Sequence, residues 1–217
     1  MVRENIHRYE NWIFDWSGTL VDDLTMVLDA TNHVMQQYGL ARMSREEFRH
    51  KFRLPYSGFY EEMLPDIPLA ELEVHFRKGF ADSEASGVTT PLLPHAVDFL
   101  DHLAATDKKM YILSSMDAEA FERHARELKV DHFFKASYAG ILDKREQIHR
   151  MIDTHQLDPE QTVFLGDMEH DVETAKHGGV ASIALLTGYQ SAQQLEKASP
   201  DLLASDLSEV KSLLVKN

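Results

Sequence analysis

The chain has 217 residues, of which 43% are hydrophobic and 27% charged, a composition typical of folded globular proteins. Its 36 acidic and 22 basic residues give a formal net charge of −14, which argues against nucleic-acid binding. The absence of cysteine excludes disulfides, thiolate catalysis and zinc–cysteine sites. No apolar run approaches the roughly 20 residues of a membrane helix. The first residues also lack an apolar signal segment, so we expect a cytoplasmic protein without membrane association.

Short apolar runs alternate with longer helical patterns along the chain, which predicts an α/β fold with a Rossmann-like parallel sheet flanked by helices. Ligands gather outside the carboxyl ends of the strands in such sheets. We therefore expect Asp15, Ser114 and Asp167, each at the end of a strand, to converge on one crevice. The expected strands span residues 12–14, 110–113, 162–165 and 182–185.

A stretch of helical patterns at residues 23–88 interrupts this alternation. Its expected helices span residues 25–38, 44–50 and 69–80, the second opened by a capping box of Ser44 and Glu47. A helical insertion directly after the first strand is expected to form a lid. The predicted domains are thus a core of residues 1–22 and 89–217 and an α-helical cap of residues 23–88.

The first expected strand delivers Asp15 to its carboxyl end, followed by a turn that contains Gly18 and Thr19. Exposed amides in such a turn would bind a phosphate beside the Asp15 carboxylate. An aspartate followed closely by glycine is also common in turns without a ligand. This segment alone therefore leaves both interpretations open.

Two acids follow the third expected strand, Asp167 and Asp171. Their spacing of four places both on one face of a helix. Neighbouring carboxylates repel each other unless a cation lies between them, and oxygen ligands suit Mg²⁺. The alternative is an acidic helix N-terminus stabilised by the helix dipole.

Two further positions carry groups suited to phosphate. Ser114 ends the second expected strand ahead of a helix that begins near Asp117, so its hydroxyl would donate to a phosphoryl oxygen or cap the helix. Lys144 opens a helical run at residues 146–155 and would offset negative charge, with Arg145 as the alternative cation. Many lysines at helix starts are merely solvated.

Together, in this order, the four segments resemble the motifs of the haloacid dehalogenase superfamily, in particular phosphoglycolate-phosphatase-like members with an α-helical cap between the first two motifs. The usual first motif is Asp-x-Asp-Gly-Thr, in which the first Asp attacks phosphorus and the second protonates the leaving group. The chain has Asp15-Trp16-Ser17-Gly18-Thr19, with serine at the acid position.

This resemblance implies a role for each matching residue. Asp15, Ser17 and Lys144 would be the catalytic positions, and Mg²⁺ would be bound by Asp15, the Ser17 carbonyl, Asp167 and Asp171. Phosphate would be bound by the turn residues and the second motif, namely Trp16, Gly18, Thr19, Ser114 and Ser115. His170, inside the fourth motif, is expected on a helix surface.

Residues 51–60 are unusually aromatic and basic for this acidic chain. We expect a loop there, because it contains Pro55 and Gly58, and family members place substrate-selecting side chains at that point. Arg53, Tyr56 and Lys51 are the candidates for substrate binding. Alternatively, the aromatic side chains pack within the cap.

Ser17 leaves the chemistry open, because a hydroxyl is a poor general acid and such catalysis contributes about 10²–10⁴-fold. The first hypothesis is a magnesium-dependent phosphatase that acts on a small phosphorylated metabolite through an aspartyl-phosphate and is slow or selective for acyl and aryl esters. The second is phosphonatase-like cleavage of a carbon–phosphorus bond, since phosphonoacetaldehyde hydrolases have a similar first motif. The third is a catalytically weak protein that binds a phosphorylated ligand or a protein partner. The expected assembly is a monomer or homodimer.

Overall fold

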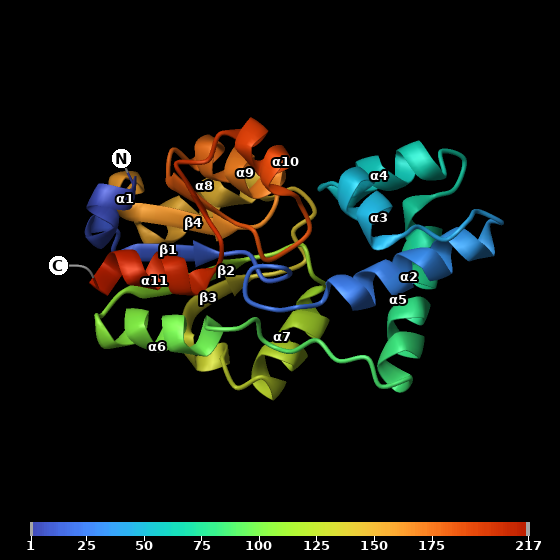
Figure 1. Ribbon diagram of the computed structural model, residues 1–217, viewed down its shortest axis with the longest axis horizontal. Coiled ribbons are helices and arrows are strands. Elements are labelled where there is room, and N and C mark those ends of the chain that lie inside the picture. The colour runs from blue at the N-terminus through green and yellow to red at the C-terminus, as the bar shows by residue number, and fades with distance from the viewer. Residues whose placement is uncertain (1, 216–217) are drawn as a thin grey trace.

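The computed structural model describes residues 2–215 and contains one parallel sheet (Figure 1). The sheet has six strands in the order β3-β2-β1-β4-β5-β6, and every neighbouring pair is parallel. The predicted α/β fold is thus confirmed. The strands are β1 (Asn11–Phe14), β2 (Lys109–Leu113), β3 (Phe134–Tyr138), β4 (Thr162–Gly166), β5 (Ala181–Leu185) and β6 (Leu202–Ala204).

Helices cover both faces of the sheet, because successive strand residues point to opposite sides. Trp12 and Phe14 pack with residues of α6 (Ala96–Ala105), α7 (Ala118–Glu127) and α11 (Leu207–Val215). Ile13 faces the other side and packs with residues of α8 (Lys144–His155) and α9 (Glu169–Gly178). The remaining helices of this part are α1 (Val2–Asn5) and α10 (Ala192–Ala198). Nowhere in residues 2–215 does a helix combine the length and apolar character needed to cross a bilayer.

The four strands expected from apolar runs are present, whereas β3 and β6 were missed. β3 lies at the edge of the sheet and alternates between half-buried and exposed residues, so it has no continuous apolar run. β6 is only three residues long. Both lie outside β2 and β5, so they widen the sheet without altering its centre, where β1 and β4 lie.

Of the five helices between β1 and β2, four lie beyond the carboxyl ends of the strands, while α6 covers the sheet (Figure 1). The four helices form a second hydrophobic cluster, which includes Val34, Phe48 and Leu72 and is joined by Met168 and Tyr189. Ser44 caps the second of them through the expected capping box. The helices are α2 (Leu24–Gln37), α3 (Arg45–Lys51), α4 (Tyr56–Met63) and α5 (Leu69–Ala85).

The loop expected around Pro55 and Gly58 is wrong, because α4 begins directly after Pro55. Proline is tolerated just before the first helical turn, where its missing N–H has no partner to lose. Gly58 lies in that first turn, and Phe59 and Tyr60 on the next positions are buried in the cluster of the insertion. Burial of the two rings therefore outweighs the poor helix propensity of glycine.

Candidate active site

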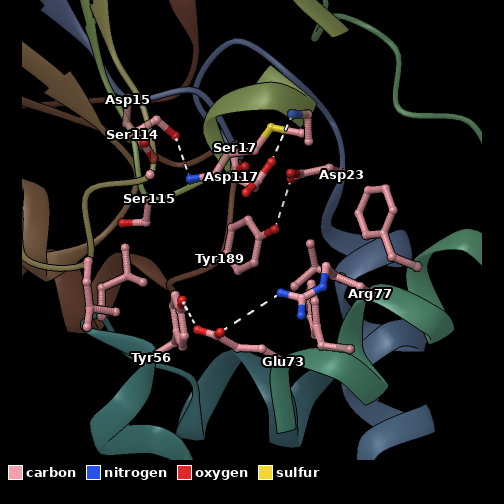
Figure 2. A pocket seen from close by; sticks show the side chains of 18 of the residues that line it. Asp15, Ser17, Asp23, Tyr56, Glu73, Arg77, Ser114, Ser115, Asp117 and Tyr189 are labelled. Atoms are coloured by element: carbon pink, nitrogen blue, oxygen red, sulfur yellow. Dashed lines mark hydrogen bonds and ion pairs between the residues drawn. The ribbon is translucent and has the colours of Figure 1, made fainter. Parts of the chain in front are cut away.

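Side chains from two central strands and the insertion meet in one cavity at the carboxyl edge of the sheet. Asp15, directly after β1, lines this cavity together with Ser17, and Ser114 and Ser115, directly after β2, line it beside them. Figure 2 shows these side chains facing the insertion, which forms the opposite wall. The pairing of β1 with β2 is what brings the two segments together.

Lys144 occupies the first position of α8, is fully buried and contacts Asp15. Its Nζ is 2.7 Å from Asp15 Oδ1 and 2.8 Å from Asp171 Oδ1. Burial disfavours the charged ammonium, but the two carboxylates outweigh that cost and raise the pKa of Lys144 above its usual value. Lys144 is therefore a fixed positive charge, and Arg145 pairs instead with Asp143 and Glu173.

Three carboxylates gather at this point, from Asp15, Asp167 and Asp171. One oxygen of each lies within 4.8 Å of the others, and all three residues are buried. Burial, assisted by the neighbouring negative charge and opposed by Lys144, raises the pKa of Asp15 to about 7. Burial and the other two acids raise the pKa of Asp167 well above its ordinary value.

These groups fit a hard divalent cation. When all three carboxylates are ionised, the single ammonium of Lys144 leaves two net negative charges in a buried space. A cation bound among the oxygen atoms would offset the repulsion that, together with burial, raises the pKa of Asp167, and carboxylate oxygens are the ligands that Mg²⁺ prefers.

The carboxylate of Asp167 is held from two sides. The Thr19 hydroxyl donates to Oδ1 at 3.3 Å, and the Tyr189 N–H donates to Oδ2 at 2.6 Å. Gly18 adopts φ +73° against this carboxylate, where an added Cβ would lie 2.5 Å from Oδ2. A residue with a side chain at position 18 would be strained and would displace Asp167.

The carboxylate of Asp171 is fixed by the backbone of its own turn. Its Oδ2 accepts N–H bonds from Asp167 at 3.2 Å and from Met168 at 3.0 Å, while Oδ1 accepts from Lys144. Asp171 thus caps its own helix turn and pairs with Lys144 at once, while its role as a Mg²⁺ ligand stays a prediction.

The serines after β2 offer donors at the rim of the cavity. Ser114 Oγ accepts the Met116 N–H at 3.2 Å, so its own proton is available for another acceptor. Ser115 Oγ is buried and has no hydrogen-bond partner among the described residues. A buried hydroxyl without a partner is costly, and an anion bound beside Asp15 would supply one.

Only the backbone of Trp16 lies near the carboxylate of Asp15. Its side chain is fully buried, packs edge-on against Phe121 with ring centroids 4.9 Å apart, and donates its indole N–H to His124 at 3.3 Å. The Trp16 backbone N–H lies close enough to the Asp15 carboxylate to lower the pKa of that group. The indole therefore anchors the turn in the core, and the peptide contacts the site.

His170 is not on a helix surface, contrary to the expectation. It is 3% exposed, and its Nε2 accepts the backbone N–H of Lys144 at 3.2 Å. Burial lowers the pKa of His170 to about 4, so the ring is neutral and can accept this bond. His170 thereby holds the first turn of α8, which carries Lys144.

The candidates for substrate binding in the insertion occupy different places. Tyr56 lines the cavity and donates its hydroxyl to Glu73 at 2.8 Å (Figure 2). Arg53 is paired with Glu62 at 2.8 Å and donates to the Gly58 carbonyl, away from the residues that line the cavity. Lys51 is exposed and does not line it either.

Two residues in the cavity were missed from the sequence, Asp23 and Tyr189. The buried Asp23 carboxylate accepts the Tyr189 hydroxyl at 2.9 Å and lies close to the Ser17 side chain. Burial raises the pKa of Asp23 to about 6, although Ser17 and Tyr189 oppose the rise. Asp23 precedes α2 and resembles a helix cap in the sequence, yet its side chain makes no capping bond.

Comparisons with known proteins agree with this arrangement. Residues 12–185 match the family model described as haloacid dehalogenase-like hydrolase. The chain is 24% identical to a 5'-nucleotidase of Pseudomonas aeruginosa, covering 98% of this chain and 99% of that protein. It is 25% identical to a phosphoglycolate phosphatase of Synechococcus elongatus, covering 94% and 98%. Its fold superimposes on that of a haloacid dehalogenase-like family protein of Streptococcus pneumoniae with a TM-score of 0.83, at 24% identity and with 95% and 99% of the two chains covered. The chain therefore belongs to the haloacid dehalogenase-like hydrolase family.

Proposed function

We propose that the protein is a magnesium-dependent phosphatase that acts on a small phosphorylated metabolite through an aspartyl-phosphate on Asp15. The observation that carries this proposal is the Asp15 carboxylate, which faces a cavity lined by the hydroxyls of Ser114 and Ser115 and contacts the ammonium of Lys144. Relatives named 5'-nucleotidase, phosphoglycolate phosphatase and pyrophosphatase support the reaction class.

In this mechanism, an oxygen of Asp15 attacks phosphorus in line with the leaving group, which departs toward the insertion. Ser114 and Ser115 donate hydrogen bonds to the phosphoryl oxygens, and Lys144 orients Asp15 and favours its ionised form. Water then attacks the aspartyl-phosphate, which releases inorganic phosphate and restores the carboxylate. Splitting the transfer in this way replaces one difficult displacement by two easier ones.

Asp15, Asp167, Asp171 and the Ser17 carbonyl would hold Mg²⁺. The ion supplies positive charge that offsets the charge of the phosphoryl oxygens. Lys144 then remains free to neutralise Asp15 and Asp171, because it contacts the carboxylate oxygens from within the core.

The leaving group is where this chain differs from the usual family pattern. Ser17 offers a hydroxyl where a carboxyl would protonate the departing oxygen, so esters of acidic alcohols and acyl phosphates should react faster than alkyl phosphates. We propose that residues 23–88 act as a cap over this end of the cavity and exclude bulk water from the reaction.

The two alternatives receive less support. A phosphonatase of the kind considered above needs a lysine that forms a Schiff base, yet no lysine occurs among the described residues that line the cavity. A protein that only binds a ligand would not require the buried arrangement of Asp15, Lys144, Asp167 and Asp171.

The test is a hydrolysis assay with acyl, aryl and alkyl phosphates and phosphonoacetaldehyde, with Mg²⁺ and in excess chelator. We expect phosphate release that requires Mg²⁺ and is abolished by Asp15→Asn. Asp22→Asn is the matched control, since Asp22 is exposed in the same segment. Full activity of Asp15→Asn, or of the wild type in excess chelator, would refute the proposal.

A further inference from the structure

The cavity extends well beyond the phosphate-binding end. Its volume is about 530 Å³, within the range of roughly 300–1,000 Å³ found for sites of drug-sized ligands. The leaving group of phosphoglycolate has only two carbons and would fill a small part of it. Asp15 and Ser114 lie at one end, and Glu73 and Arg77 of the insertion lie at the other (Figure 2).

Five aromatic side chains of the insertion line the cavity opposite Asp15. Phe76 and Phe80 of α5 face the cavity, are only half-buried, and have ring centroids 6.3 Å apart. Phe80 belongs to none of the hydrophobic clusters among the described residues, so packing within the insertion does not account for its position. The other rings that line the cavity are those of Phe52, Tyr56, Tyr60 and Tyr189.

The charges around these rings disfavour an acidic leaving group. Arg77 Nη1 lies 3.9 Å from Glu73 Oε2, so the positive charge of Arg77 is already partly offset. Glu73 also accepts the Tyr56 hydroxyl. Arg123 is the other cation that lines the cavity in the described part of the chain. Acidic side chains outnumber these two arginines: Asp15, Asp23, Glu73, Glu84, Asp117 and Glu119. A second carboxylate on the substrate would therefore meet net negative charge in this cavity.

We infer that the substrate is a phosphate monoester whose leaving group carries an aromatic ring, bound between the α5 phenylalanines and the Tyr189 side of the cavity. Aromatic rings gain from edge-on and offset contacts with one another beyond the area they bury. The inference rests on the proposed phosphatase function. Two classes of substrate have such a leaving group. In aryl phosphates the ring bears the ester oxygen, and in nucleoside 5'-monophosphates the ring lies farther from the phosphate.

The experiment measures binding of unreactive phosphonates to the Mg²⁺-loaded protein by calorimetry. We expect phenylphosphonate to bind about threefold or more tightly than cyclohexylphosphonate, which has a similar size but no aromatic ring. We also expect it to bind more tightly than phosphonoacetate, which carries a carboxylate in place of a ring. Equal affinity for the phenyl and cyclohexyl compounds, or tighter binding of phosphonoacetate, would overturn the inference.

Variants of α5 test whether its phenylalanines contact the aromatic ring of the ligand. Phe80→Leu keeps apolar volume and removes the ring, so the preference for phenylphosphonate over cyclohexylphosphonate should shrink while methylphosphonate binds as before. Phe76→Leu is a second variant should Phe80→Leu fold poorly, as judged by thermal unfolding. Val74→Leu is the control, because Val74 is 56% exposed on the same helix and does not line the cavity. An unchanged preference in both phenylalanine variants would contradict the assignment.

Binding to the Asp15→Asn variant distinguishes aryl phosphates from nucleoside 5'-monophosphates, because this variant should bind esters without hydrolysing them. Tighter binding of phenyl phosphate assigns the aryl esters, and tighter binding of a nucleoside 5'-monophosphate assigns the nucleotides. If the wild type hydrolyses phosphate esters with no aromatic preference in binding, the inference fails and the proposed function stands. If phenylphosphonate is preferred but no ester is hydrolysed, the proposed function fails instead.

Discussion

The Ser17 side chain lies close to the buried carboxylate of Asp23 and lowers the pKa of that group. The carboxyl that position 17 lacks is thus present six positions later in the chain, buried and facing the same cavity. An aspartate placed at position 17 would lie against a second carboxyl group. This pairing determines how the first motif should be tested by mutation.

The exchanged double variant Ser17→Asp/Asp23→Ser should restore proton donation to the leaving group. We expect single-turnover hydrolysis of alkyl phosphates to rise by about 10²-fold, roughly 3 kcal/mol of barrier, with little change for acyl phosphates. Ser17→Asp alone should gain less, because its carboxylate would repel that of Asp23. Equal gains in the single and double variants would show that Asp23 is irrelevant to position 17.

Asp23→Asn should stabilise the metal-free protein above pH 6. The folded pKa of Asp23 is raised from 3.8 to about 6, so the native state binds more protons than the unfolded state between these values and loses stability as pH rises through them. Asparagine removes this loss, which amounts to about 3 kcal/mol over the full range and about 2 kcal/mol between pH 4.5 and pH 8. Urea unfolding in excess chelator at pH 4.5 and pH 8 measures it, and an equal effect of the mutation at both pH values would contradict the assignment.

Asp167→Asn and Asp171→Asn should separate metal binding from folding. Both should weaken the Mg²⁺-dependent rise in melting temperature, since both remove a carboxylate from the cluster. Without metal, Asp167→Asn should be at least as stable as the wild type, because it relieves repulsion. Asp171→Asn should lose about 2 kcal/mol or more, because it breaks the buried pair with Lys144. Similar metal-free stabilities for the two variants would argue against this division.

His170→Ala should lower both stability and turnover, because the N–H of Lys144 would lose its acceptor. The expected loss of stability is about 1–3 kcal/mol. His170→Gln is the matched variant, since its side-chain carbonyl can accept the bond, and it should retain most of the activity. If glutamine is no better than alanine in thermal unfolding and in kcat, the hydrogen bond to Lys144 is not what His170 contributes.

The strands at the centre of the sheet were predictable because they are buried on both faces and form continuous apolar runs. Asp15, Ser114 and Asp167 follow the ends of these strands. Because all strands of a parallel sheet end at the same edge, their position in the sequence alone placed them near one another. β3 was not predictable in this way, because its edge position leaves it with mixed polarity. α4 was missed because Pro55 and Gly58 favour a loop locally, whereas the buried rings that decide the outcome are contacts of the folded insertion.

The contact between Asp23 and Tyr189 could not be predicted from local sequence patterns. Their hydrogen bond joins residues 166 positions apart, and nothing near either residue in the sequence indicates the other. Tyr189 lies in the loop after β5, a segment with no recognisable motif. Its role depends on the neighbouring order of β4 and β5, which brings this loop beside Asp167.

The loop that carries Tyr189 is also where the insertion is fastened to the sheet. Arg49 of α3 donates to the carbonyls of Tyr189 at 3.1 Å and Gln190 at 2.9 Å, and Gln194 donates back to the Arg49 carbonyl at 3.2 Å. Lifting α3 away would break these bonds and pull on the peptide whose N–H holds Asp167. If residues 23–88 act as the proposed cap and Asp167 as a proposed Mg²⁺ ligand, opening the cap to release product would also weaken the binding of the cation.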